Sequence, residues 1–457
     1  MRHLLLAAVA SLTLTGAARA DQRFEAVLEG HAILPAFTMT LPPADAPRDA
    51  MVSGKFTGPG NLRVDQPGSL PGTTGPAPAG RPTGIARPFI GQPVQGFSGI
   101  KPVDGEPGAY WVLTDNGFGN RRNSSDTLLM FHKVRPDFAT GAVTIERTIF
   151  LSDPDRRIPF RITYEGTETR YLTGSDFDIE SIQPVGDGFW IGDEFGPFLI
   201  HLDAEGRVRR VVETRLDGQV LMSPDNPALQ VGATPIAGAG FRVRRSGGYE
   251  GMALTPDGRT LWALLEQPLF TAGTDQAEGA FLRMLEFSIP RGEWTGRSLR
   301  YRLEPGGVAI GDFNFIDPTR ALIIERDNGE GDPSLACAAG SNPPGCFPDP
   351  ARHKRIYLVD LGAPDEEGYV RKIGHIDLMA ISDPQGVART HGDRAASEPA
   401  ARFTFPFVTI EDVAMIDADH IIVANDNNLP GSAGRRLTRA DDNEFIILRV
   451  PELLRAH

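Results

Sequence analysis

The sequence is poor in the residues that most zinc sites and covalent nucleophile sites use. It contains only two cysteines, and none of its nine histidines stands in an H-E-x-x-H motif or a similar ligand pair. The segment Gly96-Phe97-Ser98-Gly99 lacks the G-x-S-x-G spacing of a nucleophile elbow. These absences argue against a zinc hydrolase and against a serine hydrolase of the α/β type.

Basic charge and long apolar runs are also scarce. The net charge of -13 argues against a nucleic-acid partner and against an anionic membrane surface. One apolar run, residues 4–14, follows Arg2 and precedes the small-residue segment Ala18-Arg19-Ala20. It is too short to span a bilayer and is typical of a cleaved signal peptide. We therefore expect residues 1–20 to be removed, a mature start near Asp21, no membrane span, and a soluble periplasmic or secreted protein.

The two cysteines, Cys337 and Cys346, enclose a short loop rich in proline and glycine. In an oxidising compartment we expect them to form a disulfide, and two free thiols are the alternative. A loop of this size would stabilise the fold by roughly 2.5–3 kcal/mol in the chain-entropy model.

Glycine and proline are abundant, with 51 and 38 residues, and they separate short alternating segments. The clearest segment is residues 176–196, in which two strands, 179–184 and 189–192, flank a Gly-Asp-Gly turn. This pattern predicts a β-hairpin. Acidic residues stand at both of its ends, because Glu180 opens the first strand and Asp193 and Glu194 close the second.

The acidic hairpin recurs along the chain. Its leading positions are 82, 70, 62 and 99 residues apart, and they are Ser98, Glu180, Glu250, Asp312 and Glu411. A repeated β-unit with fixed polar positions predicts an all-β β-propeller, in which the blades fold as one domain over residues 21–457. Five units are visible, and the N-terminal segment together with the C-terminal strands could form another. We therefore predict six blades.

Two segments outside the repeats have predicted roles in this fold. Residues 24–28 and 32–34 can supply an outer strand that closes the ring. Residues 58–87 are dense in proline and glycine and predict a surface loop without strands.

The first strand of each blade lines the channel of a propeller, so the leading acids should meet there. Two carboxylates ~5 Å apart repel by roughly 3 kcal/mol at an effective dielectric constant of ~20. Such a cluster must take up protons or bind a cation, and oxygen ligands without histidine or cysteine favour Ca²⁺. The ends of the second strands add further acids: Asp115, Asp193, Glu194, Glu266, Glu325, Asp327 and Asp426. The alternative is that these acids are structural and hydrogen-bonded at the blade ends.

From this pattern we assign candidate roles. The candidate metal ligands are Glu180, Glu250, Glu411, Asp312, Asp115, Asp426 and Asn425. The candidate catalytic residues are Glu180, Glu250, Glu411 and Asp193, which would hold the ion or act as a base. Arg326, Arg435 and Arg121 stand beside the acids and could bind an anionic substrate group, because arginine binds phosphate oxygens bidentately. Salt bridges to the same acids are the alternative for each arginine.

Four of these segments together resemble one known family. They are residues 113–117, 178–182 and 248–254 and the pair 410–413 with 424–428, and the resemblance extends over about residues 85–450. The chain resembles the phytase-like family, described by the phrase "esterase-like activity of phytase". The resemblance implies a secreted or periplasmic β-propeller that hydrolyses phosphoric esters.

Three functions remain open at this point. The first is a calcium-dependent hydrolase of a small anionic phosphoric ester. The second is a calcium-dependent lactonase or carboxyl esterase that uses the same channel, and the third is a non-catalytic binding propeller with a structural metal. We expect a monomer in each case.

Overall fold

The computed structural model describes residues 22–58, 62–65, 68–74, 80–229, 240–341, 345–390 and 401–457. The expected signal peptide and Asp21 lie outside these residues. The described chain is all-β, as predicted. Its few helical segments are the short helix α1 (Pro451–Arg455) and the 3-10 turns η1 (Arg48–Met51) and η3 (Pro333–Leu335).

The main strands form five four-stranded antiparallel units, which we call blades 1 to 5. Blades 2, 3 and 4 are separate sheets, whereas blades 1 and 5 are joined into one larger sheet by a parallel contact at Ile33 and Ala142. From the inner strand outward, blade 1 consists of β8 (Phe97–Pro102), β9 (Tyr110–Thr114), β10 (Met130–Asp137) and β11 (Ala142–Phe150). Blade 2 consists of β12 (Ile179–Val185), β13 (Gly188–Asp193), β14 (Phe198–Asp203) and β15 (Val208–Glu213). Blade 3 consists of β18 (Tyr249–Leu254), β19 (Thr260–Leu265), β20 (Phe281–Ser288) and β21 (Glu293–Arg302). Blade 4 consists of β22 (Ala309–Phe315), β23 (Arg320–Arg326), β24 (Lys354–Asp360) and β25 (Arg371–Asp377). Blade 5 consists of β28 (Asp412–Met415), β29 (His420–Ala424), β30 (Asn443–Arg449) and β1 (Val27–Leu34).

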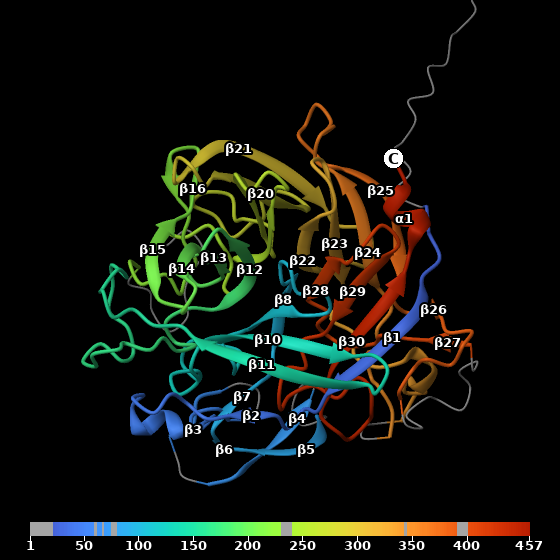
Figure 1. Cartoon of the computed structure of the whole chain (residues 1–457), viewed down its shortest axis with the longest axis horizontal. Coiled ribbons are helices and arrows are strands. Elements are labelled where there is room, and N and C mark those ends of the chain that lie inside the picture. The colour runs from blue at the N-terminus through green and yellow to red at the C-terminus, as the bar shows by residue number, and fades with distance from the viewer. Residues whose placement is uncertain are drawn as a thin grey trace, which may run out of the picture.

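The blades are arranged radially around the inner strands (Figure 1). Strand β8 contacts β12, β12 contacts β18, β18 contacts β22, β22 contacts β28, and β28 contacts β8. The inner strands therefore close a ring, which is the arrangement expected of a propeller.

The prediction of six blades is not confirmed, because the described residues form five. The N-terminal and C-terminal strands do not build a separate blade. Strand β1 instead pairs antiparallel with β30, from Val27 opposite Arg449 to Leu34 opposite Asn443, and completes blade 5. The first strand of the chain thus closes the ring, as residues 24–34 predicted.

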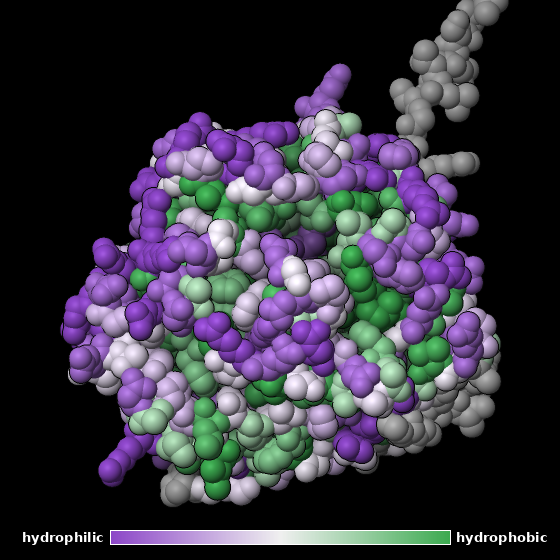
Figure 2. All heavy atoms as spheres, in the orientation of Figure 1, coloured by the Kyte–Doolittle hydropathy of each residue, from purple (hydrophilic) through white to green (hydrophobic). Residues whose placement is uncertain are grey.

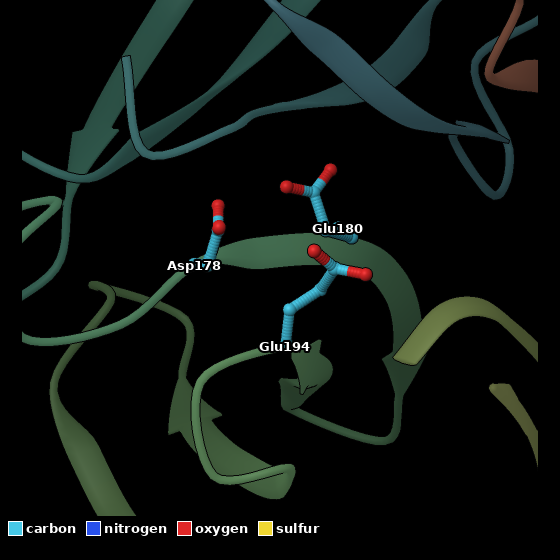
Figure 3. Close-up of side chains that lie close together, drawn as sticks. All are labelled: Asp178, Glu180 and Glu194. Atoms are coloured by element: carbon cyan, nitrogen blue, oxygen red, sulfur yellow. The ribbon is translucent and has the colours of Figure 1, made fainter. Parts of the chain in front are cut away.

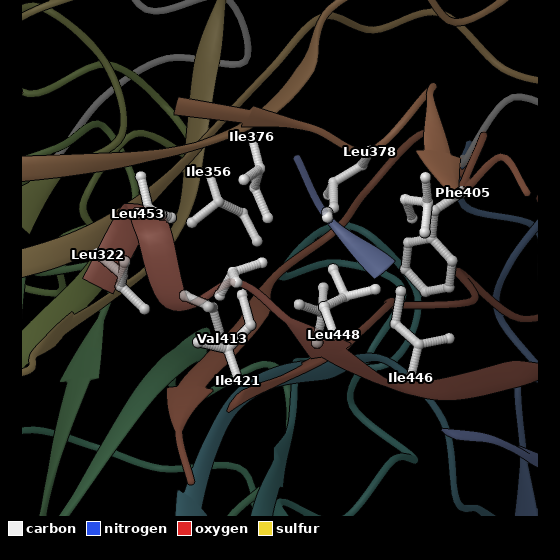
Figure 4. Close-up of a cluster of buried hydrophobic side chains, with 14 of the residues drawn as sticks. Leu322, Ile356, Ile376, Leu378, Phe405, Val413, Ile421, Ile446, Leu448 and Leu453 are labelled. Carbon is white, nitrogen blue, oxygen red and sulfur yellow. The ribbon is translucent and has the colours of Figure 1, made fainter. Parts of the chain in front are cut away.

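Apolar side chains fill the space between neighbouring blades. The largest cluster joins blades 4 and 5 and includes Leu322, Ile356, Val413, Ile421 and Ile446 (Figure 4). These five side chains are fully buried, and burial of one such side chain stabilises a fold by about 1.5–3 kcal/mol. This packing fixes the blades relative to one another and therefore fixes the residues at their inner edges.

Five short strand pairs add to the blades. They are β2 (Met39–Thr40) with β7 (Gln92–Pro93), β3 (Val52–Ser53) with β6 (Phe89–Ile90), β4 (Leu70–Thr74) with β5 (Arg81–Arg87), β16 (Arg215–Leu216) with β17 (Gln219–Val220), and β26 (Ile381–Ser382) with β27 (Arg402–Phe403). Four are separate two-stranded sheets, and the fifth, β26 with β27, extends the large sheet because β26 pairs with β1. The prediction of a strandless loop over residues 58–87 is wrong, because β4 and β5 form a hairpin there.

The hairpin of β4 and β5 is attached to the loop that follows β29. The Thr83 hydroxyl donates a hydrogen bond to the carbonyl oxygen of Pro430 at 2.6 Å. Arg81 forms an ion pair with Glu330. These contacts hold the hairpin near the ends of the second strands.

On the face shown in Figure 2, hydrophobic side chains form separate patches among hydrophilic ones. Within the described ranges, the structure contains no helix that is long and apolar enough to cross a membrane.

Candidate functional site

The inner strands share an irregularity at the point where the leading acids lie. Their pairing with the second strand shifts register between Ile179 and Ser181 in blade 2 and between Tyr249 and Gly251 in blade 3. A β-bulge of this kind bends the strand and redirects the extra side chain. The extra residues are Glu180 and Glu250. Similar shifts occur in blades 1 and 4, and in blade 5 Glu411 directly precedes β28.

The bulges bring acids from different blades together. One carboxylate oxygen each from Glu180, Glu250 and Glu411 lies within 4.8 Å of the others, although these residues come from blades 2, 3 and 5. Asp178, Glu180 and Glu194 form a second triad under the same 4.8 Å limit, and their carboxylates lie close together (Figure 3). Glu180 belongs to both triads. We call the residues of the two triads the acid cluster.

A second set of residues lies at or just after the ends of the second strands. In the order of the blades they are Asp115, Glu194, Glu266, Arg326 and Asp426. Blade 4 is therefore the exception, since it supplies a base where the other blades supply acids.

Arg326 bridges the acids of its two neighbouring blades. One guanidinium nitrogen donates to Glu266 Oε1 at 3.2 Å and to Glu411 Oε1 at 3.1 Å. Burial alone would lower the pKa of Arg326, but the carboxylates of Glu411, Glu266 and Glu250 raise it above its usual value. Arg326 is therefore a permanent positive charge at the edge of the acid cluster.

The acid cluster contains more negative charge than Arg326 can compensate. Burial, followed by repulsion from neighbouring carboxylates, raises the pKa values of Glu180, Glu194 and Glu250 well above their usual range. Burial also raises the pKa of Asp178 to about 6 and that of Glu266 to about 7.

Several carboxylate oxygens in the cluster are buried without a hydrogen-bond partner. These are Asp178 Oδ1, Glu194 Oε1 and Glu250 Oε1, and each of the three residues is at most 5% exposed. Buried polar atoms normally have partners, so a set of bare oxygens facing one another indicates a position for a proton or a cation.

Asp312 does not belong to this set, contrary to the predicted alignment. Its oxygens accept hydrogen bonds from the backbone N–H groups of Phe313 and Val413 and from the Asn314 side chain. The residue that matches Glu180 and Glu250 is Gly311, so the sequence alignment was wrong by one position. A Cβ atom at Gly311 would lie 2.3 Å from the carbonyl oxygen of Ile410, which explains why blade 4 carries no side chain there.

Two further predicted site residues are occupied by backbone contacts. The carboxylate of Asp193 accepts the N–H groups of Asp178 at 2.9 Å and Gly196 at 2.7 Å, so it holds the turn that carries Glu194. The Asn425 side chain accepts the N–H of Glu444 and donates to two backbone carbonyls. Both residues therefore shape the chain around the site, and neither presents a free oxygen to it.

Two of the three predicted substrate-binding arginines bind other groups. Arg435 forms a buried two-point ion pair with Glu444, at 2.9 and 2.7 Å. Arg121 donates to the backbone carbonyls of Ser175 and Asp225. The salt-bridge alternative is correct for Arg435, and Arg326 is the one that contacts the acid cluster.

The remaining predicted ligands, Asp115 and Asp426, lie beside the cluster and each keeps local hydrogen bonds. Asp115 accepts from Gln95 and from the N–H of Gly117, while burial and the charge of Asp426 raise its pKa well above the usual range. Burial and the charge of Glu411 raise the pKa of Asp426 to about 8.

Sequence reasoning missed Asp178 as a site residue, and it placed Glu194 and Glu266 among the acids of the channel without naming them as metal ligands or catalytic residues. Asp178 directly precedes β12 and lies two residues before Glu180, in the same acidic segment of the sequence. That spacing could have identified it. Glu325 and Asp327 lie in other contacts, with His353 and Lys354 respectively.

Comparisons with known proteins give one match that covers most of the chain. A family model described as "Phytase-like: Esterase-like activity of phytase" matches residues 92–429. An uncharacterized secreted protein of Arthroderma benhamiae is 27% identical over 151 residues, which make up 31% of this chain and 28% of that protein. The chain thus aligns with less than a third of the length of this relative.

Solved structures give weaker matches. A luciferin-regenerating enzyme has 11% identity and a TM-score of 0.34, with 78% of this chain and 79% of that chain covered. KlHsv2 with loop 6CD replaced by a Gly-Ser linker has 10% identity and a TM-score of 0.25, with 68% and 67% covered.

Proposed function

This chain belongs to the phytase-like family, and on that premise we propose that it is a calcium-dependent hydrolase of phosphoric esters on a five-bladed propeller. The observation that carries the proposal is the convergence of Glu180, Glu250 and Glu411 from three blades.

Repulsion within this triad is large compared with the stability of a protein. Two ionised carboxylates with oxygens 4.8 Å apart repel by about 3.5 kcal/mol at an effective dielectric constant of ~20. Three such pairs would cost about 10 kcal/mol, whereas folded proteins are stable by only about 5–15 kcal/mol. The triad therefore holds protons or a cation, and a cation leaves all three carboxylates ionised.

The chemistry of the donors supports calcium. Both triads offer carboxylate oxygens alone, without histidine or cysteine. Hard oxygen ligands suit Ca²⁺, which accepts six to eight of them in flexible geometry. Glu180, Glu250 and Glu411 would hold one ion, and Asp178 and Glu194 with Glu180 could hold another.

The roles of the residues follow from their positions. A bound cation polarises an ester and lowers the pKa of a coordinated water molecule. Glu266 is held by Arg326 and has a pKa of about 7, so it can accept a proton from the attacking water near neutral pH. Arg326 would stabilise negative charge that develops on the substrate.

A carboxyl ester or lactone is the second candidate substrate class. The family description names an esterase-like activity without specifying the acid. The acid cluster and a bound cation could serve either ester, since water attacks a polarised phosphorus atom in one reaction and a polarised carbonyl carbon in the other.

We further propose that the protein acts outside the cytoplasm. Cys337 and Cys346 form a disulfide, as predicted, and disulfides persist in oxidising compartments. The name of the Arthroderma benhamiae relative describes that protein as secreted. We propose cleavage after Ala20 and a monomer in solution.

Turnover assays test the proposal. Purified mature protein would be assayed on phosphomonoester, phosphodiester, carboxyl-ester and lactone substrates, with Ca²⁺ and with a chelator. We expect hydrolysis of a phosphoric ester that the chelator abolishes and Ca²⁺ restores. If no substrate is hydrolysed and the chelator lowers only thermal stability, the protein is a binding propeller with a structural metal.

A further inference from the structure

One buried arginine of the described chain has no partner. Arg87, at the end of β5, is 7% exposed, and its Nε atom has no hydrogen-bond partner. Burial lowers the pKa of Arg87, and no neighbouring carboxylate raises it again. A guanidinium that has lost its hydration and gained no counter-charge is costly.

The other buried arginines show how exceptional this is. Four more arginines in the described residues are buried, and each forms an ion pair with an acid; the pairs are Arg81 with Glu330, Arg170 with Asp153, Arg326 with Glu266 and Glu411, and Arg435 with Glu444. Arg87 forms none. An ion pair within the protein therefore does not explain why Arg87 is buried.

Arg87 lines a cavity of about 220 Å³ that extends to Asp115, beside the acid cluster. Phe118, Leu429 and Pro430 form apolar parts of its wall, and Ser432 adds a hydroxyl group. Asp115 lines the same cavity. Among the described residues of the lining, Arg87 is the one basic residue and Asp115 the one acidic residue.

We propose that the cavity at Arg87 is a binding subsite for an oxyanion, namely a phosphate or carboxylate group of a small ligand. Guanidinium groups bind such oxyanions through two parallel hydrogen bonds. The cavity is large enough for the anion and a small organic group, and the apolar wall can cover that group. The Ser432 hydroxyl can donate a further hydrogen bond.

The position of the subsite gives the ligand an orientation. Because Asp115 belongs both to the cavity lining and to the ring of acids near Glu180, an anion at Arg87 would direct the rest of its molecule toward the acid cluster. The assignment of this anion to the substrate rests on the proposed function, whereas the binding of an anion at Arg87 does not.

Anion binding can be measured without turnover. Calorimetric titrations of the mature, calcium-loaded protein would use phenylphosphonate, with acetate as the carboxylate probe in parallel. The variants are Arg87→Gln, which removes the charge, and Arg87→Lys, which keeps it without the fork of two donors. Arg122→Gln is the matched control, since Arg122 is an exposed arginine in the nearby loop after Phe118.

We expect Arg87→Gln to weaken binding of the preferred probe at least tenfold, Arg87→Lys to weaken it less, and Arg122→Gln to leave it unchanged. A preference for phenylphosphonate identifies a phosphate group as the ligand, and a preference for acetate identifies a carboxylate. We also expect Arg87→Gln to melt at the same temperature as the wild type or higher without probe, because no ion pair is lost.

Two results would overturn the proposal: equal affinity of the wild type and Arg87→Gln for both probes, or a clear loss of thermal stability in Arg87→Gln without any change in anion affinity. Anion binding through Arg87 together with no ester turnover would support the subsite and reject the proposed hydrolase. Ester turnover that is unchanged in Arg87→Gln, with no anion binding in the wild type, would reject the subsite alone.

Discussion

Glu180 is the residue whose substitution tests the electrostatic reasoning most sharply, because it belongs to both triads. Glu180→Gln keeps the size of the side chain and removes one negative charge. In the metal-free protein this removes repulsion that amounts to about 3.5 kcal/mol for each ionised neighbour at 4.8 Å. Protons already relieve part of that repulsion, so the gain in stability will be smaller than this sum.

The same substitution should act in the opposite direction when calcium is present. A neutral amide oxygen replaces a charged ligand, and hydrogen bonds and contacts to a charged group contribute about 1.5–3 kcal/mol. We therefore expect calcium affinity to fall by roughly ten- to a hundredfold. Glu180→Gln should thus raise the melting temperature in chelator and reduce the additional stabilisation that Ca²⁺ provides.

The assay is thermal unfolding in chelator and in Ca²⁺, together with calorimetric calcium titration. Glu205→Gln is a matched control, since Glu205 is an exposed acid in the turn after β14. A melting temperature that falls in chelator, or calcium affinity equal to that of the wild type, would refute the idea that Glu180 lies in a repulsive cation site.

Two other predictions concern pH and the disulfide. Glu266 and Asp426 have folded-state pKa values of about 7 and 8, above their usual values near 4, so the metal-free folded protein binds more protons than the unfolded chain between about pH 4 and 8. Its unfolding free energy should fall as pH rises through this window, by about 1.4 kcal/mol per pH unit for each such group, and saturating Ca²⁺ should flatten or reverse this slope. Denaturant unfolding at pH 5 and pH 8 measures the effect. A metal-free protein that is more stable at pH 8 than at pH 5 would contradict the prediction. Replacing Cys337 and Cys346 by serine should lower stability by about 2.5–3 kcal/mol in the chain-entropy model without changing calcium affinity, and loss of calcium binding would show that the loop contributes to the site.

Much of the fold could be predicted from the recurrence of one hairpin. Alternating apolar residues and Gly/Asp turns gave the strands, and the repeated acids gave the inner edges of the blades. The number of blades could not be derived in this way, because a strand that closes a ring and a strand that begins a new blade have the same local pattern. Strand β1 shows this, since only its pairing with β30 decides between five blades and six.

The site could be predicted in part for a similar reason. Glu180, Glu250 and Glu411 carry the repeat and do converge. Asp312 was placed with them because a β-bulge shifts the alternation by one residue, and a sequence pattern does not show which residue becomes the extra one. The partners of Asp193, Asn425 and Arg435 are backbone groups or acids that only the folded chain brings near.

Arg87 shows what a sequence pattern cannot reveal at all. It lies in a segment rich in glycine and proline that predicted a loop, and nothing in its neighbours along the chain distinguishes it. Arg87 stands out because it forms no ion pair in the folded protein, whereas buried acids such as Glu330 pair with other arginines. That difference is visible only once the contacts of the folded chain are known.

A crystal structure of the mature protein grown with Ca²⁺, with anomalous difference maps used to locate the ion, tests most directly whether the three converging glutamates bind a cation. We expect an anomalous peak ligated by oxygens of Glu180, Glu250 and Glu411, at the 2.3–2.6 Å typical of calcium ligands. A map in which these three carboxylates face one another with no peak between them, in protein that saturating calcium does not stabilise, would contradict this expectation.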